Sequence, residues 1–323
     1  MERPDTSGVP HMPVSTWREA MERALYGPDG FFVRQAPASQ FRTSVHASSQ
    51  LSTAIATLVH KVDAVLGHPD RFDIVDIGAG RGELLEALRV QLADPRLRFT
   101  AVEIADRPPG LSPDISWLRE VPTGTVGLVV ATEWLDNVPV DVVGRDGDGV
   151  ARLLLTDGTL GPAADPETVD WLAAWWPDFE QAEAGLTRDR AWRSALAGHT
   201  GLALAVDYGH TKDQRPFFST LTGYREGRQV QPAPDGSTDI TAHVAMDSLS
   251  TGESILISQR DALRALGITG ARPPLSLASS DPRRYLRALV AATEAAELTD
   301  PAGLGGHWWL LEGRGVDVAR CFP

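Results

Sequence analysis

The stretch FDIVDIGAGRGELLEAL, from Phe72 to Leu88, decides the fold of this chain. A short apolar run ends at Ile77, three glycines follow within five positions, and a helical pattern begins after them. This order predicts a buried strand, a tight turn and the start of a helix. Ligands of open α/β sheets bind beyond the carboxyl ends of the strands, so the glycine turn is the expected ligand site.

Short apolar strands alternate with helical patterns on both sides of this stretch. Such an alternation predicts a parallel sheet with helices on both faces. We therefore expect an open, doubly wound, Rossmann-like α/β sheet. The expected helices are 17–26, 48–66 and 82–92, and the expected strands are 73–77, 98–104, 115–118, 126–131 and 201–207.

The spacing of these elements predicts two parts and an insertion. Residues 1–70 are expected to form an N-terminal helical cover, and residues 71–323 the sheet domain. About seventy residues separate the strands that end near 131 and begin near 201, whereas a crossover needs only about a dozen. We therefore predict an insertion at about 140–200, before the fifth core strand. It contains a strand pair and a helix whose tryptophans, at 171, 175 and 176, are expected to pack in a core or lid.

Composition limits the class of partner. The 323 residues are 42% hydrophobic and can bury a sizeable core, while the net charge of -13 disfavours nucleic acid and favours a cationic partner. The single cysteine, Cys321, allows no internal disulfide. With no apolar run long enough to span a bilayer, we expect a cytoplasmic protein without membrane insertion. The histidines show no zinc-ligand spacing, so no metal is expected.

The spacing of the glycines selects between cofactors. A dinucleotide fingerprint would place its third glycine at position 83, which is Glu83, and this carboxylate would repel a pyrophosphate. The observed glycines, Gly78, Gly80 and Gly82, follow the acidic Asp76. This G-x-G-x-G pattern resembles that of S-adenosyl-L-methionine (SAM) methyltransferases, whose cofactor carries no phosphate.

A carboxylate on the next strand supports this choice. Glu103 ends that strand, where an acidic side chain can accept hydrogen bonds from both ribose hydroxyls. We therefore predict a SAM site made by Asp76, the glycine turn and Glu103.

Further motifs occur in order along most of the chain. They are ALYGPDGFF (24–32), SQFRTSVH (39–46), DIGAGRG (76–82), ATEWLDNVP (131–139), DYGH (207–210), TLTGYREGR (220–228), DITAHV (239–244) and SQRDALRALGI (258–268), with a final strand expected in HWWLLEGRG. Together they resemble the MidA-type family, the bacterial and mitochondrial proteins related to the methyltransferase that assists respiratory complex I assembly.

The resemblance implies methyl transfer from SAM to an arginine of a protein substrate. It also implies that Thr43 and Ser44, which match the family pattern, belong to the cofactor site. The chain departs from the pattern at Val45 and His46, which replace a Pro-Glu pair, and at Ala245, which replaces an aspartate. These departures lie outside the SAM motif, so we expect them to affect the choice of substrate and not the binding of SAM.

Arginine methylation requires acidic side chains at the reacting end. A guanidinium has five donors and no acceptor, so carboxylates must localise its charge and aim the reacting nitrogen. Glu133 and Asp136 follow the fourth strand, and Asp207 ends the strand after the insertion. We predict these three as catalytic residues. The alternative is structural: a helix N-terminus for Glu133, a turn for Asp136 and a strand end for Asp207.

Other side chains near these motifs have open roles. Tyr208 follows Asp207 and is a candidate lining residue of the acceptor site. His243 is expected near a helix start capped by Thr241, more as a structural histidine than as a general base. Two other functions remain open: a methyltransferase acting on a metabolite, and a non-catalytic assembly protein that keeps the SAM-binding fold.

Overall fold

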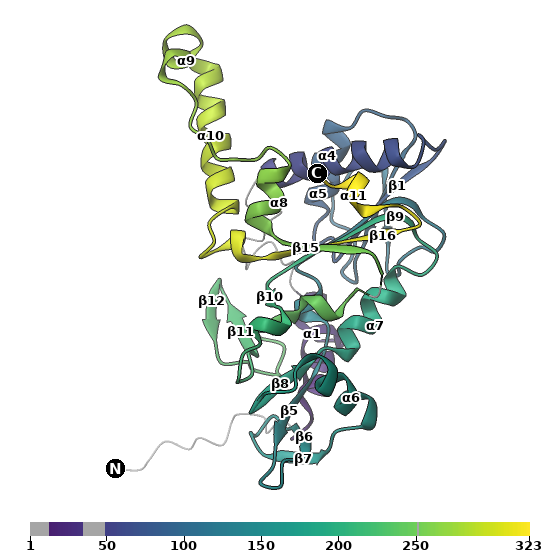
Figure 1. Cartoon of the computed structure of the whole chain (residues 1–323), viewed down its shortest axis with the longest axis vertical. Coiled ribbons are helices and arrows are strands. Elements are labelled where there is room, and N and C mark those ends of the chain that lie inside the picture. Colours follow the sequence, from purple (N-terminus) through teal and green to yellow (C-terminus); the bar gives the residue numbers. More distant parts are fainter. Residues whose placement is uncertain (1–12, 35–48, 251) are drawn as a thin grey trace.

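The computed structural model describes residues 13–34, 49–250 and 252–323. Its centre is a seven-stranded sheet with the order β15-β16-β9-β4-β1-β2-β3 (Figure 1). Neighbours from β9 to β3 pair in parallel, whereas β16 is antiparallel to both β9 and β15. This confirms the predicted Rossmann-like α/β sheet. The strands are β1 (Phe72–Ile77), β2 (Leu97–Val102), β3 (Ile115–Leu118), β4 (Val126–Thr132), β9 (Thr200–Asp207), β15 (Ser254–Ser258) and β16 (Trp308–Arg314).

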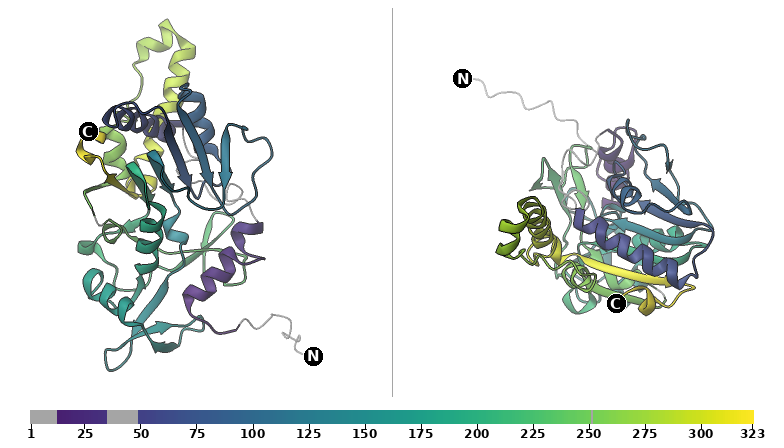
Figure 2. Two further views of the ribbon diagram at one scale, coloured as in Figure 1. Left: turned by 90° about the vertical axis from the view of Figure 1, so that its right-hand side faces the viewer. Right: turned by 90° about the horizontal axis from the view of Figure 1, so that it is seen from above.

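Helices cover both faces of this sheet, as two views at right angles show (Figure 2). On one face lie α4 (Ser49–Val65), α5 (Glu83–Gln91), α8 (Gln259–Ala265), α10 (Pro282–Leu298) and α11 (Val318–Cys321). The opposite face packs against α7 (Leu186–Ala195), whose Trp192 is fully buried. Alternate residues of each strand therefore enter different cores, which is why the strands read as nearly continuous apolar runs.

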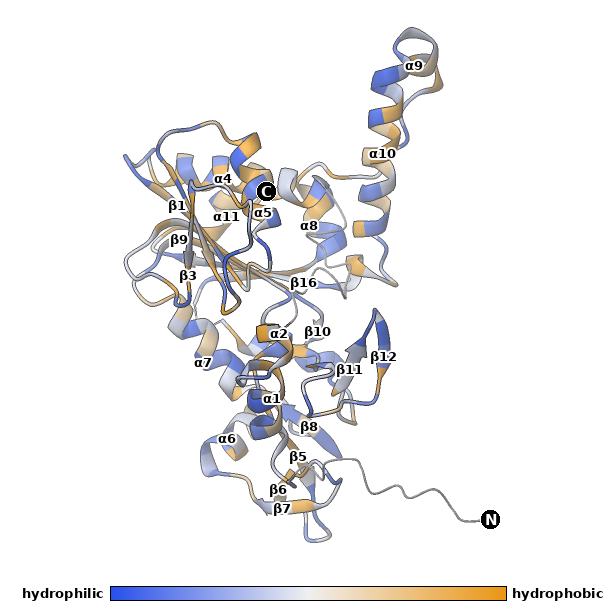
Figure 3. Cartoon of the chain, turned by 180° about the vertical axis from the view of Figure 1, so that it is seen from behind, coloured by the Kyte–Doolittle hydropathy of each residue, from blue (hydrophilic) through white to orange (hydrophobic). Residues whose placement is uncertain are grey.

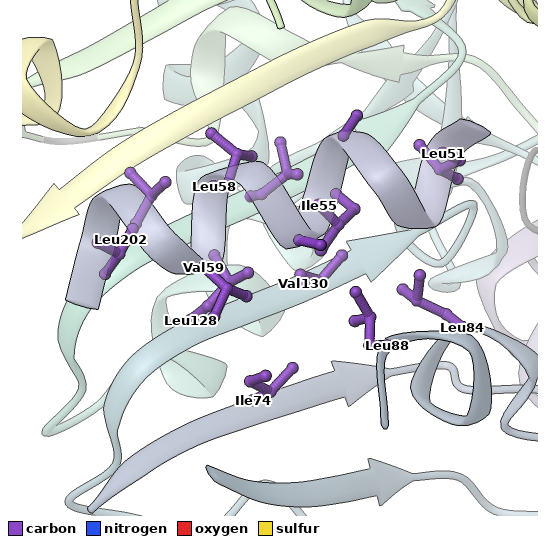
Figure 4. Packing of buried hydrophobic residues seen from close by; sticks show 14 of the residues in the cluster. Leu51, Ile55, Leu58, Val59, Ile74, Leu84, Leu88, Leu128, Val130 and Leu202 are labelled. Atoms are coloured by element: carbon purple, nitrogen blue, oxygen red, sulfur yellow. The ribbon is translucent and has the colours of Figure 1, made fainter. Parts of the chain in front are cut away.

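Helix α4 is an integral part of the sheet's core. Its residues Leu51, Ile55 and Leu58 are fully buried and pack over the central strands (Figure 4). Burial of each such side chain contributes about 1.5–3 kcal/mol. Helix α1 (Trp17–Tyr26), in contrast, packs against β5 and β13 beside the insertion. The two helices of the expected N-terminal cover thus contact different parts of the molecule.

The insertion forms its own small sheet, in the order β7-β6-β5-β8, below the main sheet in Figure 1. It comprises β5 (Asp141–Arg145), β6 (Ala151–Leu154), β7 (Leu160–Ala163), α6 (Pro166–Trp175) and β8 (Gln181–Ala184). Trp171 and Trp176 are buried in its core and Trp175 packs against it, which confirms the expected packing role.

Two smaller sheets lie between the insertion and the main sheet. One joins β12 (Arg228–Val230), β11 (Thr222–Arg225) and β13 (Asp239–Thr241), and the other joins β10 (Gly209–His210) and β14 (Val244–Ala245). The expected helix start at Thr241 is therefore wrong, because this residue ends a strand.

The remaining helices are short or lie at the periphery. They are α2 (Phe31–Arg34) and α9 (Leu275–Ser280), with 3-10 turns at Leu135–Asn137 (η2), Lys212–Gln214 (η3), Met246–Ser248 (η4) and Leu304–Gly306 (η5). With α10, α9 makes a hairpin that projects from the body and carries apolar residues on its surface (Figure 3). In the described part of the chain, the structure contains no helix with the length and hydrophobicity needed to traverse a bilayer.

Candidate functional site

A cavity of about 1170 Å³ opens at the carboxyl ends of the central strands. The β1–α5 turn and the end of β2 line one part of it. The β4–η2 segment, residues of β9–β10, β11 and β13, and the loop before β16 line the other. Typical small-molecule pockets hold about 300–1,000 Å³. The volume therefore suffices for a nucleoside cofactor together with an acceptor side chain.

The glycine turn adopts a backbone that favours glycine. Gly78, Gly80 and Gly82 have φ values of 70°, 58° and 83°. Gly78 and Gly80 line the cavity, and a Cβ on Gly80 would meet only Glu83 Oε2, at 3.8 Å. Gly82 is not among the lining residues; a Cβ there would lie 2.7 Å from a methyl group of Leu111. Gly82 therefore allows Leu111 to pack closely against the turn. Gly78 and Gly80 expose backbone without a side chain to the cavity.

Two carboxyl groups meet beside this turn. Asp76 is buried at the end of β1, and its Oδ1 finds no hydrogen-bond partner among the described residues. Burial, with the nearby charges of Glu103 and Glu83, raises the pKa of Asp76 from 3.8 to about 8. Glu103 accepts hydrogen bonds from the backbone N–H groups of Gly80, Ile104 and Ala105 at 3.0, 2.7 and 3.1 Å.

This half of the cavity fits a cationic nucleoside cofactor such as SAM. A buried carboxyl group with an unused oxygen is stabilised by a cation, and the bare backbone of the turn allows close approach. We expect Asp76, Gly78, Gly80 and Glu103 to hold the cofactor. The structure brings these four predicted residues together.

Glu133 begins the other half of the cavity. It directly follows β4 with a φ of 51°, an unusual conformation for a residue other than glycine. Its N–H donates to the carbonyl of Val206, and its Oε1 lies 3.9 Å from Nδ1 of His307. This strained backbone holds the carboxylate against the cavity wall.

Asp136 is the centre of a buried hydrogen-bond network. Its Oδ2 accepts from the hydroxyls of Tyr208 and Thr241, each at 2.6 Å, and these two hydroxyls also contact each other. Its Oδ1 is buried without a hydrogen-bond partner within the described ranges. The network joins η2 to the link between β9 and β10 and to β13, and all three of its members line the cavity.

Asp239 also lines the cavity, although no role was predicted for it. Asn137 Nδ2 donates to its carboxylate at 2.6 Å. Burial, followed by the charge of Asp136, raises the pKa of Asp239 well above its usual value. The DITAHV motif contains Asp239, and this match was the only available signal. Asp239 and Asn137 are 102 positions apart in sequence, so the contact between them depends on the tertiary fold.

Asp207, predicted as catalytic, is not among the cavity-lining residues. Its carboxylate accepts hydrogen bonds from the backbone N–H groups of Leu135, Asp136 and Tyr208 at 2.9, 3.2 and 3.0 Å. Asp207 therefore lies behind the cavity wall that the other two predicted catalytic residues line. Its geometry suits a positioning residue that fixes η2 and Tyr208.

Arg188 has a related positioning geometry that the sequence analysis missed. Its side chain is 1% exposed and donates to the carbonyl oxygens of Asp136, His243 and Val138 at 2.5, 2.8 and 3.4 Å. A buried guanidinium with several acceptors can hold separate loops in one arrangement. No periodicity or motif marked it in advance.

Thr43 and Ser44, like Val45 and His46, lie outside the described residues. Tyr26 and Phe32 reach the cavity, and the Tyr26 hydroxyl donates to the carbonyl of Asn137 at 3.1 Å.

A Rossmann-like sheet with a glycine turn and a cavity lined by carboxyl groups at its carboxyl edge is typical of SAM-dependent methyltransferases. The family model described as "Putative S-adenosyl-L-methionine-dependent methyltransferase" matches residues 54–257, and the chain belongs to this family. The predicted MidA-type resemblance is confirmed. No curated protein matches the sequence.

Two solved structures from Burkholderia thailandensis resemble the whole chain. One contains bound S-adenosyl-homocysteine (SAH); it is 25% identical, covers 94% of this chain and 89% of its own, and has a TM-score of 0.76. The other, a native structure, is 24% identical, covers 94% and 88%, and has the same TM-score of 0.76. The protein is a SAM-dependent methyltransferase, and its predicted cofactor, SAM, is confirmed.

Proposed function

We propose that this enzyme methylates an arginine side chain of a protein substrate. The observation that carries the proposal is the set of three carboxyl groups, Glu133, Asp136 and Asp239, in the part of the cavity beyond the glycine turn. When bound, SAM supplies a methyl group activated by its sulfonium. The residues of the chain then have to bind, orient and neutralise the acceptor.

The electrostatics of these groups favour a cationic acceptor. The pKa of Asp239 is raised by burial and by its acidic neighbours Asp136 and Glu133, so negative charge is concentrated on this side of the cavity. A guanidinium can supply five N–H donors to such a site. Pairing with one carboxylate in a bidentate manner would also aim one nitrogen towards the methyl group.

A small cationic metabolite would satisfy the same carboxylates, and the assay must separate the two acceptors. The purified protein is incubated with SAM labelled in the methyl group and with extract of its host cells. Label recovered as methylarginine after hydrolysis of the protein fraction supports the proposal. Label confined to the small-molecule fraction, or absent from all fractions, contradicts it.

A defined assay uses an arginine peptide and the same peptide with lysine in its place. Asp239→Asn should lower transfer to the arginine peptide while leaving SAH affinity unchanged, because Asp239 lies on the acceptor side. Asp148→Asn, on an exposed loop of the insertion, is the matched control. Equal loss of activity in both variants would indicate that the acceptor is bound elsewhere.

A further inference from the structure

His307 is a buried histidine in the acceptor half of the cavity. It follows η5 and directly precedes β16, and its side chain is 11% exposed. Nδ1 has no hydrogen-bond partner among the residues that the structure describes. A buried polar atom without a partner costs about 1–3 kcal/mol, so a histidine in this position needs an explanation.

The fold fixes the backbone that carries this imidazole. The N–H of His307 donates to the carbonyl of Leu304 at 3.1 Å, and its carbonyl accepts from the N–H of Gln259 at 2.7 Å. The Gln259 side chain is itself buried and donates to the carbonyl of Leu304 at 2.8 Å. The next residue, Trp308, pairs with Asp207 across the sheet, which sets His307 beside Tyr208. The ring centroids of Tyr208 and His307 are 5.7 Å apart.

The surroundings of the ring keep it neutral and place acidic groups beside it. Burial lowers the pKa of His307 from 6.5 to about 4, although the charge of Asp136 opposes this effect. Glu133 Oε1 lies 3.9 Å from Nδ1. His243, the other imidazole near this site, is also kept neutral by burial and by the charge of Arg188, both of which lower its pKa. A neutral imidazole retains one unprotonated nitrogen, which can accept a proton.

We propose that His307 accepts the proton released by the acceptor nitrogen during methyl transfer. The inference rests on the proposed function in one respect: the acceptor is a protonated nitrogen, as arginine is. Methyl transfer forms an N–C bond while the C–S bond breaks, and the electron pair of that bond stays on sulfur. The acceptor nitrogen then loses one proton to the imidazole, and the resulting imidazolium passes it to solvent.

Even a weak base suffices for this step. A guanidinium nitrogen that has gained a methyl group and still carries all its protons belongs to a dication, which is a strong acid. Glu133 stabilises the imidazolium because an opposite charge within about 4–6 Å favours the charged form. His307 therefore combines an available lone pair, a location on the cavity wall and a counter-ion for the charged state.

The test compares His307→Asn with His60→Asn. His60 is exposed on α4, remote from the machinery described above, and serves as the matched control. We expect His307→Asn to lower kcat on the arginine peptide by about 100-fold or more, the usual contribution of acid–base catalysis. KM for the peptide and the Kd for SAH should stay within twofold. A fall in kcat of less than threefold would overturn the proposal.

Ring titration by NMR gives a readout that needs no acceptor. In the protein without peptide, His307 should titrate near pH 4. Its pKa should fall further in Glu133→Gln, which removes the nearby carboxylate charge. A His307 that is charged at neutral pH, or that does not respond to Glu133→Gln, would overturn the proposal.

The outcomes separate the two proposals. If the wild-type enzyme methylates only the lysine peptide, the arginine acceptor is wrong, and the same variants test His307 on lysine, which also loses a proton. Transfer to neither peptide refutes both the protein acceptor and the role of His307.

Discussion

Gly80→Ala tests the cofactor site with a single methyl group. Gly80 has a φ of 58°, and a Cβ there would have no neighbour closer than Glu83 Oε2 at 3.8 Å. The added methyl group therefore does not collide with the protein and instead occupies cavity space. The left-handed backbone costs an alanine about 1–2 kcal/mol of folding stability.

The variant should also lose affinity for SAH, which the backbone strain does not explain because the strain is present with and without ligand. Overpacking by a methyl group costs about 1–3 kcal/mol. This corresponds to a Kd raised roughly 5- to 150-fold. Gly67→Ala is the matched control, because Gly67 has a φ of 75° and a Cβ there would meet nothing within 4 Å. It should lose similar stability and leave SAH binding unchanged.

The assay is calorimetric titration with SAH, combined with chemical denaturation of both variants. A folded Gly80→Ala variant whose Kd for SAH lies within twofold of the wild-type value would refute the placement of the cofactor against this turn. Gly80→Val extends the series, since a β-branched side chain is larger and stiffer at the same position. We expect it to abolish binding.

Three further predictions concern charged residues. Glu133→Gln should leave the Kd for SAH unchanged and reduce methyl transfer at least tenfold, because the acceptor loses a charge-assisted partner; unchanged turnover would move the acceptor site elsewhere. Because the folded protein raises the pKa of Asp76 from 3.8 to about 8, the contribution of its retained proton to stability is complete below pH 3.8 and is lost as the pH rises towards 8. Denaturation curves of Asp76→Asn without cofactor should lack this decline, and an identical pH profile would contradict the assignment. Arg188→Met should lower the free energy of unfolding by about 3–5 kcal/mol, as expected when a buried charged group leaves its partners unsatisfied; a loss below about 1 kcal/mol in urea denaturation would show that its carbonyl contacts are dispensable.

Local patterns predicted the core of the fold correctly. The apolar run of β1, the glycine turn and the following helix lie next to each other in sequence, so their geometry depends on nearby residues alone. The insertion was predicted on a different ground, the length of the connection between two strands. Strand β15 was missed, because a short apolar run has no periodicity that separates a strand from a helix.

The expected helix start at Thr241 failed for a different reason. A threonine often caps a helix by accepting from the backbone. Here its hydroxyl donates to Asp136 at 2.6 Å, across 105 positions of sequence. The Thr241 hydroxyl therefore pairs with a distant carboxylate instead of a nearby backbone N–H group, and the segment forms the strand β13.

The sequence by itself determined the cofactor half of the site. Asp76, Gly78 and Gly80 lie within five positions of the chain, and Glu103 directly follows the neighbouring parallel strand, so one βαβ unit is enough to bring them together.

Only the tertiary structure decided the acceptor half. Glu133 and Asp136 come from the β4–η2 segment, Asp239 from β13 and His307 from the loop before β16, and the meeting of these three segments requires the arrangement of several sheets around one cavity. The tertiary structure also places Asp207 outside the cavity lining, because its carboxylate accepts hydrogen bonds from three backbone N–H groups. Spacing along a chain encodes contacts within an element or between neighbouring strands. Contacts between distant segments depend on packing, which no local pattern contains.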